Sequence, residues 1–206
     1  MIRNIIFDWS GTLSNDILHV YETVMKMFEH FGINRISLDE FRDSYRLPYM
    51  AHARMFGIKA SKEEVDAVFE QHFRRTGFPK PINGAEKTLQ SLKAKGVRMI
   101  VLSSHNPALL EEEARMFFGT AHFFDGVFGD VQDKVKGIGA IMESVGFGQK
   151  DTLIVGDTEH DINAGKSAGI LAVAVLSGYR SRKHLEGAGP DFVIDDVTRL
   201  FSLGVF

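Results

Sequence analysis

The chain has 206 residues, of which 44% are hydrophobic and 25% are charged, and its formal net charge is −3. This length and composition predict a globular protein with one large domain, or one domain carrying a smaller insertion. The charge gives no basic excess for nucleic acid or an anionic membrane, and the lack of cysteine excludes disulfide bonds and thiolate metal sites.

No apolar stretch has the length of a membrane span or a signal peptide. The longest purely apolar run, residues 170–176, is far too short to cross a bilayer, and Asp8 interrupts the first run near the start. We therefore expect a soluble cytoplasmic protein, a monomer or a homodimer. Its partner should be a small molecule, with no binding to nucleic acid or membrane.

Short apolar runs alternate with helical patterns along most of the chain. Runs of this kind are typical of buried parallel strands. They lie at residues 5–7, 99–102, 153–155, 171–176 and 192–194. Helical patterns separate them, for example at residues 85–95 and 107–117. The alternation predicts an α/β fold with a doubly wound parallel sheet.

Residues 15–83 break this alternation, because they carry helical signals and no strand signal. Apolar side chains recur at helical spacing from Ile17 to Phe31. Ser37 and Ser61 are each followed three residues later by a glutamate, which is the pattern of a helix capping box. We predict an inserted all-helical domain over residues 15–83, and an α/β core domain made of residues 1–14 and 84–206.

Polar side chains lie where the predicted strands end, or just before them. They are Asp8, Ser103, Ser104, Lys134, Asp157 and Asp161. Because ligands of open α/β sheets bind at the carboxyl ends of the strands, we expect these residues to meet there. The set suits phosphoryl transfer: Asp8 as a nucleophile, and Lys134 with a serine hydroxyl at the phosphoryl oxygens. Clustered carboxylates favour Mg²⁺ as the cofactor.

Four segments resemble the motifs of the haloacid dehalogenase-like phosphohydrolase superfamily, and the phosphoglycolate-phosphatase-like branch is the most similar. They are "DWSGTL" at residues 8–13, "MIVLSS" at 99–104, the lysine at 134, and "IVGDTEHD" at 154–161. The resemblance implies a Rossmann-like core with a helical cap domain inserted after the first motif. It also implies an Mg²⁺-dependent phosphohydrolase that cleaves a small phosphorylated metabolite through an aspartyl-phosphate.

The resemblance assigns roles to individual positions. The catalytic set is Asp8, Ser10, Ser103 and Lys134. The phosphate contacts are Gly11, Thr12, Ser103, Ser104 and Lys134. The metal ligands are Asp8, Asp157 and Asp161, with Ser10 contributing its backbone carbonyl. In the cap, residues 43–50 form a candidate specificity loop whose Arg46 would meet a substrate carboxylate or a second phosphate. Lys136 is the alternative to Lys134.

Ser10 departs from the family pattern, in which a second aspartate stands two residues after the nucleophile. That aspartate protonates the leaving group and then activates water, which is typically worth ~10²–10⁴ in rate. A serine cannot do this near neutral pH. Three hypotheses remain open. The first is a slow phosphatase, or one in which His105 or His160 is the acid. The second is a phosphonoacetaldehyde hydrolase-like enzyme that cleaves a C–P bond. The third is a non-catalytic phosphate-binding or regulatory protein. The phosphonoacetaldehyde hydrolase-like enzyme requires a cap lysine, and none occurs between residues 27 and 58, where it would be expected.

Overall fold

A computed structural model describes residues 1–46, 49–73, 75, 78–119 and 123–206. Within these residues, six parallel strands form one sheet in the order β5-β4-β1-β6-β7-β8. The strands are β1 (Asn4–Phe7), β4 (Arg98–Leu102), β5 (Gly126–Phe128), β6 (Thr152–Gly156), β7 (Leu171–Val175) and β8 (Phe192–Ile194). The chain starts in the middle of the sheet and extends it in both directions, so the point where the strand order reverses lies beside β1. Ligand sites are expected at such a point.

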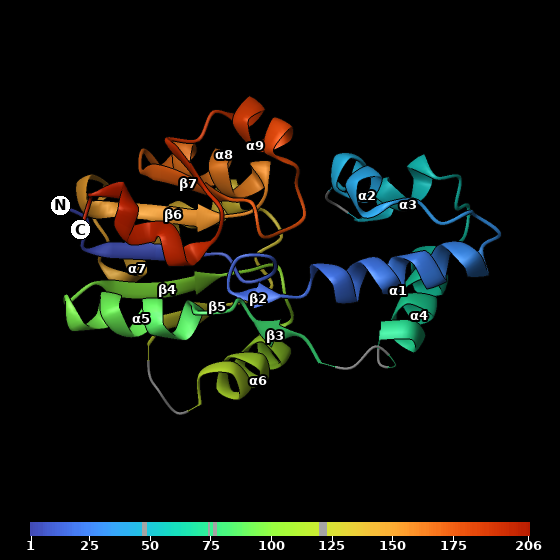
Figure 1. Cartoon of the computed structure of the whole chain (residues 1–206), viewed down its shortest axis with the longest axis horizontal. Helices are drawn as coiled ribbons and strands as arrows, with labels where there is room; N and C mark the ends of the chain where they lie inside the picture. Colours follow the sequence, from blue (N-terminus) through green and yellow to red (C-terminus); the bar gives the residue numbers. More distant parts are fainter. Residues whose placement is uncertain (47–48, 74, 76–77, 120–122) are drawn as a thin grey trace.

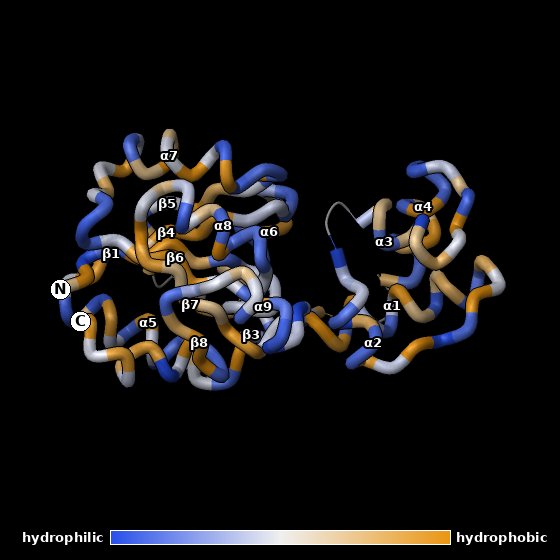
Figure 2. The backbone as a smooth tube through the Cα atoms, turned by 90° about the horizontal axis from the view of Figure 1, so that it is seen from above, coloured by the Kyte–Doolittle hydropathy of each residue, from blue (hydrophilic) through white to orange (hydrophobic). Residues whose placement is uncertain are grey.

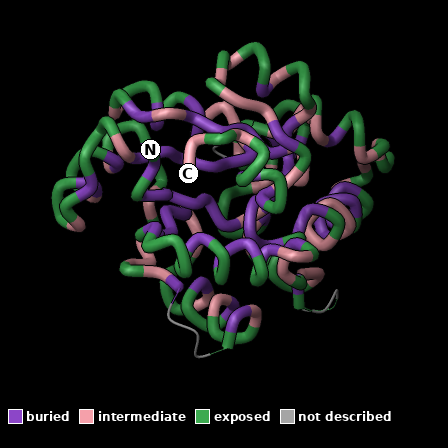
Figure 3. The backbone as a smooth tube through the Cα atoms, turned by 60° about the vertical axis from the view of Figure 1, so that its left-hand side comes forward, coloured by how far each residue is buried: buried purple, intermediate pink, exposed green. Residues whose placement is uncertain are grey.

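Helices cover both faces of the sheet, so the predicted doubly wound α/β fold is confirmed (Figure 1). Side chains alternate along each strand: Ile5 and Phe7 pack under one layer and Ile6 under the other. In Figure 3 the buried stretches of the backbone lie in the middle of the molecule and the exposed stretches surround them. One layer holds α5 (Ala85–Ala94), α6 (Pro107–Phe118) and the 3-10 helix η2 (Val197–Leu203); the other holds α7 (Lys134–Val145), α8 (Glu159–Ala168) and α9 (Arg182–Ala188).

Four helices form a separate unit beside the sheet (Figures 1 and 2). They are α1 (Ile17–His30), α2 (Leu38–Ser44), α3 (Tyr49–Met55) and α4 (Lys62–Phe73). They enclose a hydrophobic cluster of their own, which Tyr179 joins from the segment after β7. Both predicted capping boxes are present, at Ser37 and at Ser61. None of the described helices, in either unit, is long and apolar enough to cross a membrane.

Two details differ from the sequence-based expectation. A two-stranded antiparallel ribbon, β2 (Ser14–Asn15) with β3 (Lys80–Pro81), pairs the segments that enter and leave the helical unit, although no strand was expected in residues 15–83. Strands of two residues carry no periodicity that a sequence pattern can reveal. The edge strand β5 was also not predicted, because it is three residues long and only partly buried, without the continuous apolar run of a central strand.

Candidate active site

The end of β1 directs the Asp8 side chain toward α7 and α8. Its backbone N–H still pairs with the carbonyl of Val155 on β6 at 2.9 Å. The next residue, Trp9, is fully buried on the opposite face, where its indole N–H donates to Glu113 of α6 at 2.6 Å. Because neighbouring side chains of an extended segment point to opposite faces, the anchored indole fixes the direction of the Asp8 carboxylate.

Three buried carboxylates meet at this point. Ligand oxygens of Asp8, Asp157 and Asp161 all lie within 4.8 Å of one another. Asp157 follows β6, and one of its oxygens accepts from the backbone N–H of Tyr179 at 2.6 Å. Asp161 lies in the first turn of α8, where its Oδ2 accepts from the N–H and the hydroxyl of Thr158. Asp161 therefore caps the helix and contributes to the cluster at the same time.

Lys134 joins these carboxylates from the start of α7. Its ammonium group donates to Asp161 at 2.6 Å and also to Asp8. The Lys134 side chain is almost fully buried, whereas that of Lys136 is 85% exposed and pairs with Asp133. The structure therefore brings Lys134 to the carboxylates and leaves Lys136 at the surface.

The protonation equilibria reflect this crowding. Burial raises the pKa of Asp8 to about 6, with a smaller contribution from the neighbouring Asp161 carboxylate. Burial, and then the charges of Asp8 and Asp161, raise the pKa of Asp157 well above its ordinary value. Burial lowers the pKa of Lys134, but the two carboxylates outweigh it, so the net shift is upward. One lysine faces three carboxylates, and a set of oxygen donors with excess negative charge fits a hard divalent cation such as Mg²⁺.

A tight turn follows Asp8. Gly11 has φ +70°, and a Cβ there would lie 2.6 Å from a carboxylate oxygen of Asp157, so the turn requires glycine. Thr12 is fully buried. Both were predicted to contact phosphate, but neither is among the described residues that line the adjacent cavity. Gly11 lies against Asp157, and the N–H of Thr12 donates to the carbonyl of Trp9 at 3.2 Å, so both belong to the turn itself.

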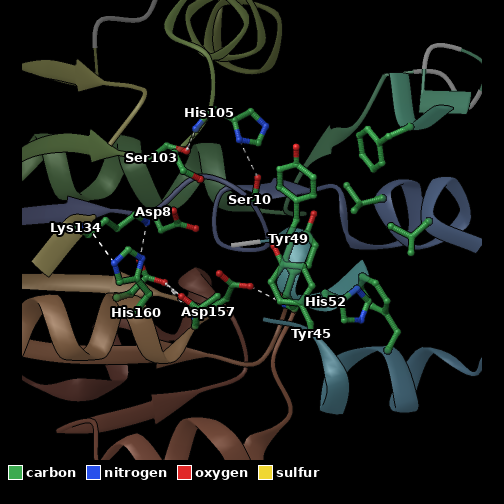
Figure 4. A pocket seen from close by; sticks show the side chains of 18 of the residues that line it. Asp8, Ser10, Tyr45, Tyr49, His52, Ser103, His105, Lys134, Asp157 and His160 are labelled. Atoms are coloured by element: carbon green, nitrogen blue, oxygen red, sulfur yellow. Dashed lines mark hydrogen bonds and ion pairs between the residues drawn. The ribbon is translucent and has the colours of Figure 1, made fainter. Parts of the chain in front are cut away.

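Ser10, which lines the cavity, has two neighbours that the sequence did not reveal. Its hydroxyl lies 3.5 Å from Nδ1 of His105 (Figure 4). The buried carboxyl of Asp16 accepts from the N–H of Gly11 at 3.0 Å. Burial raises the pKa of Asp16 to about 7, and the hydroxyl of Ser10 partly offsets this rise. An aspartate just before a helix is typical of an N-cap. The Asp16 side chain makes no capping hydrogen bond, however, and binds the backbone of Gly11 instead.

The two candidate acid histidines have different neighbours in the cavity. The backbone N–H of Lys134 donates to Nε2 of His160 at 3.1 Å, so that nitrogen is an acceptor and the ring proton is on Nδ1. Burial lowers the pKa of both His160 and His105. His105 is the one next to Ser10, the position of the missing aspartate.

A cavity of about 300 Å³ lies between the carboxylates and the helical unit (Figure 4). Ser103 and Ser104 both line it, and the buried Ser103 hydroxyl accepts from the N–H of His105 at 3.2 Å. Arg46 is not among the described lining residues; it is exposed and donates to the carbonyl of Ser44. The predicted specificity loop is only partly defined, because residues 47–48 lie outside the described residues.

Comparisons with known proteins identify the family and the fold. The family model for haloacid dehalogenase-like hydrolases matches residues 5–175. The chain is 26% identical to the pyrophosphatase PpaX of Bacillus mycoides over 98% of this chain and 96% of that protein. It is 27% identical to the phosphoglycolate phosphatase of Aquifex aeolicus, with the same coverage. A haloacid dehalogenase-like hydrolase structure from Streptococcus pneumoniae superposes with a TM-score of 0.82 at 18% identity, covering 98% of both chains, which shows a common fold.

Proposed function

The chain belongs to the haloacid dehalogenase-like hydrolase family, and from this premise we propose that it is a phosphatase that cleaves small phosphorylated metabolites with Asp8 as nucleophile. One observation carries the proposal. Lys134 bridges Asp8 and Asp161 in a buried cluster with Asp157, at the end of a cavity large enough for a small ligand. The similarity to phosphatases and pyrophosphatases over nearly the whole chain supports the same reaction class.

Asp8, Asp157 and Asp161 are the residues that would hold Mg²⁺, with the backbone carbonyl of Ser10 as a further ligand. When bound, the ion supplies positive charge that offsets the repulsion among the carboxylates and between them and the phosphate. The buried position of the three acids supports this role, because three carboxylates with one lysine leave an uncompensated negative charge in a region of low dielectric.

The reaction then proceeds in two displacements. A carboxylate oxygen of Asp8 bonds to phosphorus while the bond from phosphorus to the leaving oxygen breaks, and that oxygen takes up a proton. Water next attacks phosphorus, the bond to Asp8 breaks, and inorganic phosphate is released. Lys134 and the Ser103 hydroxyl donate hydrogen bonds to the phosphoryl oxygens, whose negative charge is greatest in the transition state. Lys134 also keeps Asp8 ionised and therefore nucleophilic.

The leaving group needs a proton that Ser10 cannot supply. His105 is the candidate that the geometry favours, because Nδ1 lies 3.5 Å from the Ser10 hydroxyl and both residues line the cavity. Burial lowers the pKa of His105, so only its minor protonated form would donate this proton near neutral pH. His160 has one ring nitrogen occupied by the backbone of Lys134. We propose that hydrolysis of alkyl phosphates is slow compared with that of enzymes carrying an aspartate at this position.

The helical unit is proposed to be a cap domain over residues 15–83 on a core of residues 1–14 and 84–206. The contacts of Arg180, which follows β7, support a fixed position of this domain relative to the core. Its guanidinium pairs with Glu159 at 2.7 Å and donates to the carbonyls of Arg42 and Asp43 at the end of α2. Arg42 in turn donates to the carbonyl of Gly178 at 3.0 Å. These contacts hold the cap over the cavity.

Cleavage of a C–P bond in phosphonoacetaldehyde is a weaker alternative. That chemistry uses a cap lysine as a Schiff base, and the one lysine among the described cavity-lining residues is Lys134, which belongs to the core. A purely phosphate-binding protein is the third possibility, and it would have no need of the nucleophile Asp8.

A release assay distinguishes the three functions. Phosphate is measured from p-nitrophenyl phosphate, phosphoglycolate, pyrophosphate and phosphonoacetaldehyde, with and without Mg²⁺. Turnover of phosphate esters that requires Mg²⁺ and is lost in Asp8→Asn is the expected result. Release from phosphonoacetaldehyde alone would favour the C–P hydrolase. Binding of phosphate without turnover of any substrate would favour the non-catalytic protein.

A further inference from the structure

The cavity has two chemically different ends (Figure 4). At the core end lie the acids, Lys134 and the two serines, all suited to a phosphate and its metal. At the cap end the wall is mainly apolar. Its side chains come from α1, α4 and two tyrosine-bearing segments: Val20, Val24, Val65, Phe69, Tyr45 and Tyr179. The rings of Tyr45 and Tyr179 pack against each other with centroids 4.8 Å apart, between the phosphate end and the cap.

No lysine or arginine of the helical unit is among the described residues that line the cavity. Lys134 is the only lysine or arginine among the described residues that line the cavity, and it is already paired with Asp8 and Asp161. Two arginines of the helical unit donate to backbone carbonyls elsewhere: Arg42 to that of Gly178, and Arg54 to that of Ile58.

The polar groups of the cap wall also provide no site for a second negative charge on the substrate. Asp66 is the one acid that the cap contributes to the described lining, and its carboxylate accepts from the hydroxyl of Tyr49 and pairs with Lys62. His52 also lines the cavity, and burial lowers its pKa to about 4, so it is uncharged at neutral pH. A carboxylate or a second phosphate placed here would lose hydration, and the nearby ammonium group of Lys62 is already paired with Asp66.

We propose that the preferred substrate is a phosphomonoester whose leaving group is uncharged and apolar, of aryl-alkyl or branched alkyl type, and lies against the cap wall. This rests on the proposed function for the reacting end of the cavity. An apolar group gains the burial free energy of the wall and can stack on the paired tyrosines. The preference therefore differs from the substrates in the names of the relatives, whose leaving groups are anionic.

Three alkyl esters test the preference, because each loses an alkoxide and they differ mainly in the group that meets the cap. They are benzyl phosphate, ethyl phosphate and phosphoglycolate, with pyrophosphate added. We expect kcat/KM for benzyl phosphate to exceed that for ethyl phosphate by about tenfold or more, and that for phosphoglycolate to be lowest of the three esters. Equal values for benzyl and ethyl phosphate, or a preference for phosphoglycolate or pyrophosphate, would overturn the inference.

Binding separates this inference from the proposed function. Benzylphosphonate, ethylphosphonate and phosphonoacetate cannot be hydrolysed, and their Kd values are measured by titration calorimetry in the presence of Mg²⁺. We expect the same order of affinity. Tighter binding of benzylphosphonate together with no turnover of any ester would support the apolar site and contradict the phosphatase. Turnover of the esters with tighter binding of phosphonoacetate would support the phosphatase and contradict the apolar site.

A charge reversal on α4 provides a matched pair of variants. In Asp66→Lys the cap wall gains a cation at the cavity, whereas Glu63→Lys makes the same charge change on an exposed position of the same helix that does not line it. We expect Asp66→Lys to raise the affinity for phosphonoacetate relative to ethylphosphonate by about fivefold or more, and Glu63→Lys to leave the ratio unchanged. An equal ratio in Asp66→Lys and the wild type would overturn the proposal.

Discussion

The ammonium group of Lys134 lies 2.6 Å from a carboxylate oxygen of Asp161, in a cluster that is almost completely buried. The two residues begin different helices, α7 and α8, which pack against each other on one face of the sheet. This contact ties the position of the lysine to that of the acid: removal of Lys134 leaves Asp161 without its cation, whereas removal of Asp161 leaves Lys134 paired with Asp8.

Replacement of Lys134 by alanine should lower kcat by about 10²–10³, because the transition state loses a positive charge and Asp8 loses its hydrogen-bond donor. Lys136→Ala is the control, since that side chain is exposed and pairs only with Asp133. Steady-state kinetics on p-nitrophenyl phosphate give the result. A loss of activity confined to Lys136→Ala would show that the lysine has been assigned wrongly.

Asp8→Asn should lower phosphate release by about 10³ or more while the protein stays folded. An amide keeps the shape of the side chain but cannot attack phosphorus, and Lys134 retains its contact with Asp161. Circular dichroism checks the fold, and release from p-nitrophenyl phosphate checks the activity. A rate near that of the wild type would contradict the nucleophilic role.

Metal removal should abolish turnover. Exhaustive treatment with EDTA removes the charge that offsets the three carboxylates, and added Mg²⁺ should restore the rate. Ca²⁺ should support turnover poorly, because it prefers more ligands and a looser geometry. The rate of phosphate release in each state is the measurement. Activity that survives chelation would favour the metal-free chemistry of the dehalogenases instead.

Ser10→Asp should accelerate hydrolysis of alkyl phosphates, up to about 10²-fold, and affect p-nitrophenyl phosphate less, because nitrophenolate leaves without a proton. Ser10→Asn serves as the control, because asparagine has nearly the same volume as aspartate and no titrating group. The buried Asp16 next to Ser10 will oppose the added charge. Rates that stay level or fall for every alkyl phosphate would indicate that another group, such as His105, already carries the proton.

The stability of the cap should depend on pH through His52, which burial holds at a pKa of about 4. An unfolded histidine titrates near 6.5, so between about 6.5 and 4 the unfolded chain binds a proton that the folded one does not. The free energy of unfolding should therefore fall as the pH is lowered through this window, by about 3 kcal/mol at most.

Urea unfolding of the wild type and of His52→Gln at pH 7 and pH 4.5 measures this contribution. The variant lacks the titrating ring, so the stability difference between the two proteins should shrink at the lower pH. His30→Gln, at an exposed position in the last turn of α1, is the control. A difference that is the same at both pH values would contradict the role of His52.

The sequence by itself determined the core fold and the main acids. Continuous apolar runs identify central parallel strands, and the carboxyl ends of such strands necessarily share one edge of the sheet. Asp8 and Asp157 each follow such a run, so their meeting could be predicted without coordinates. The helical insertion could be predicted too, because capping boxes and a helical apolar spacing are local signals.

Only the tertiary structure decided which of two nearby lysines reaches the acids and what surrounds Ser10. Lys134 and Lys136 differ by two residues, and the rotation of α7 against α8 buries one and exposes the other. His105 reaches Ser10 from a distant segment, and the nearby Asp16 turns back to Ser10 instead of capping α1, which no local pattern encodes. The apolar wall of the cavity likewise arises from packing of the cap against the core, because side-chain neighbours across two units depend on long-range contacts and not on periodicity along the chain.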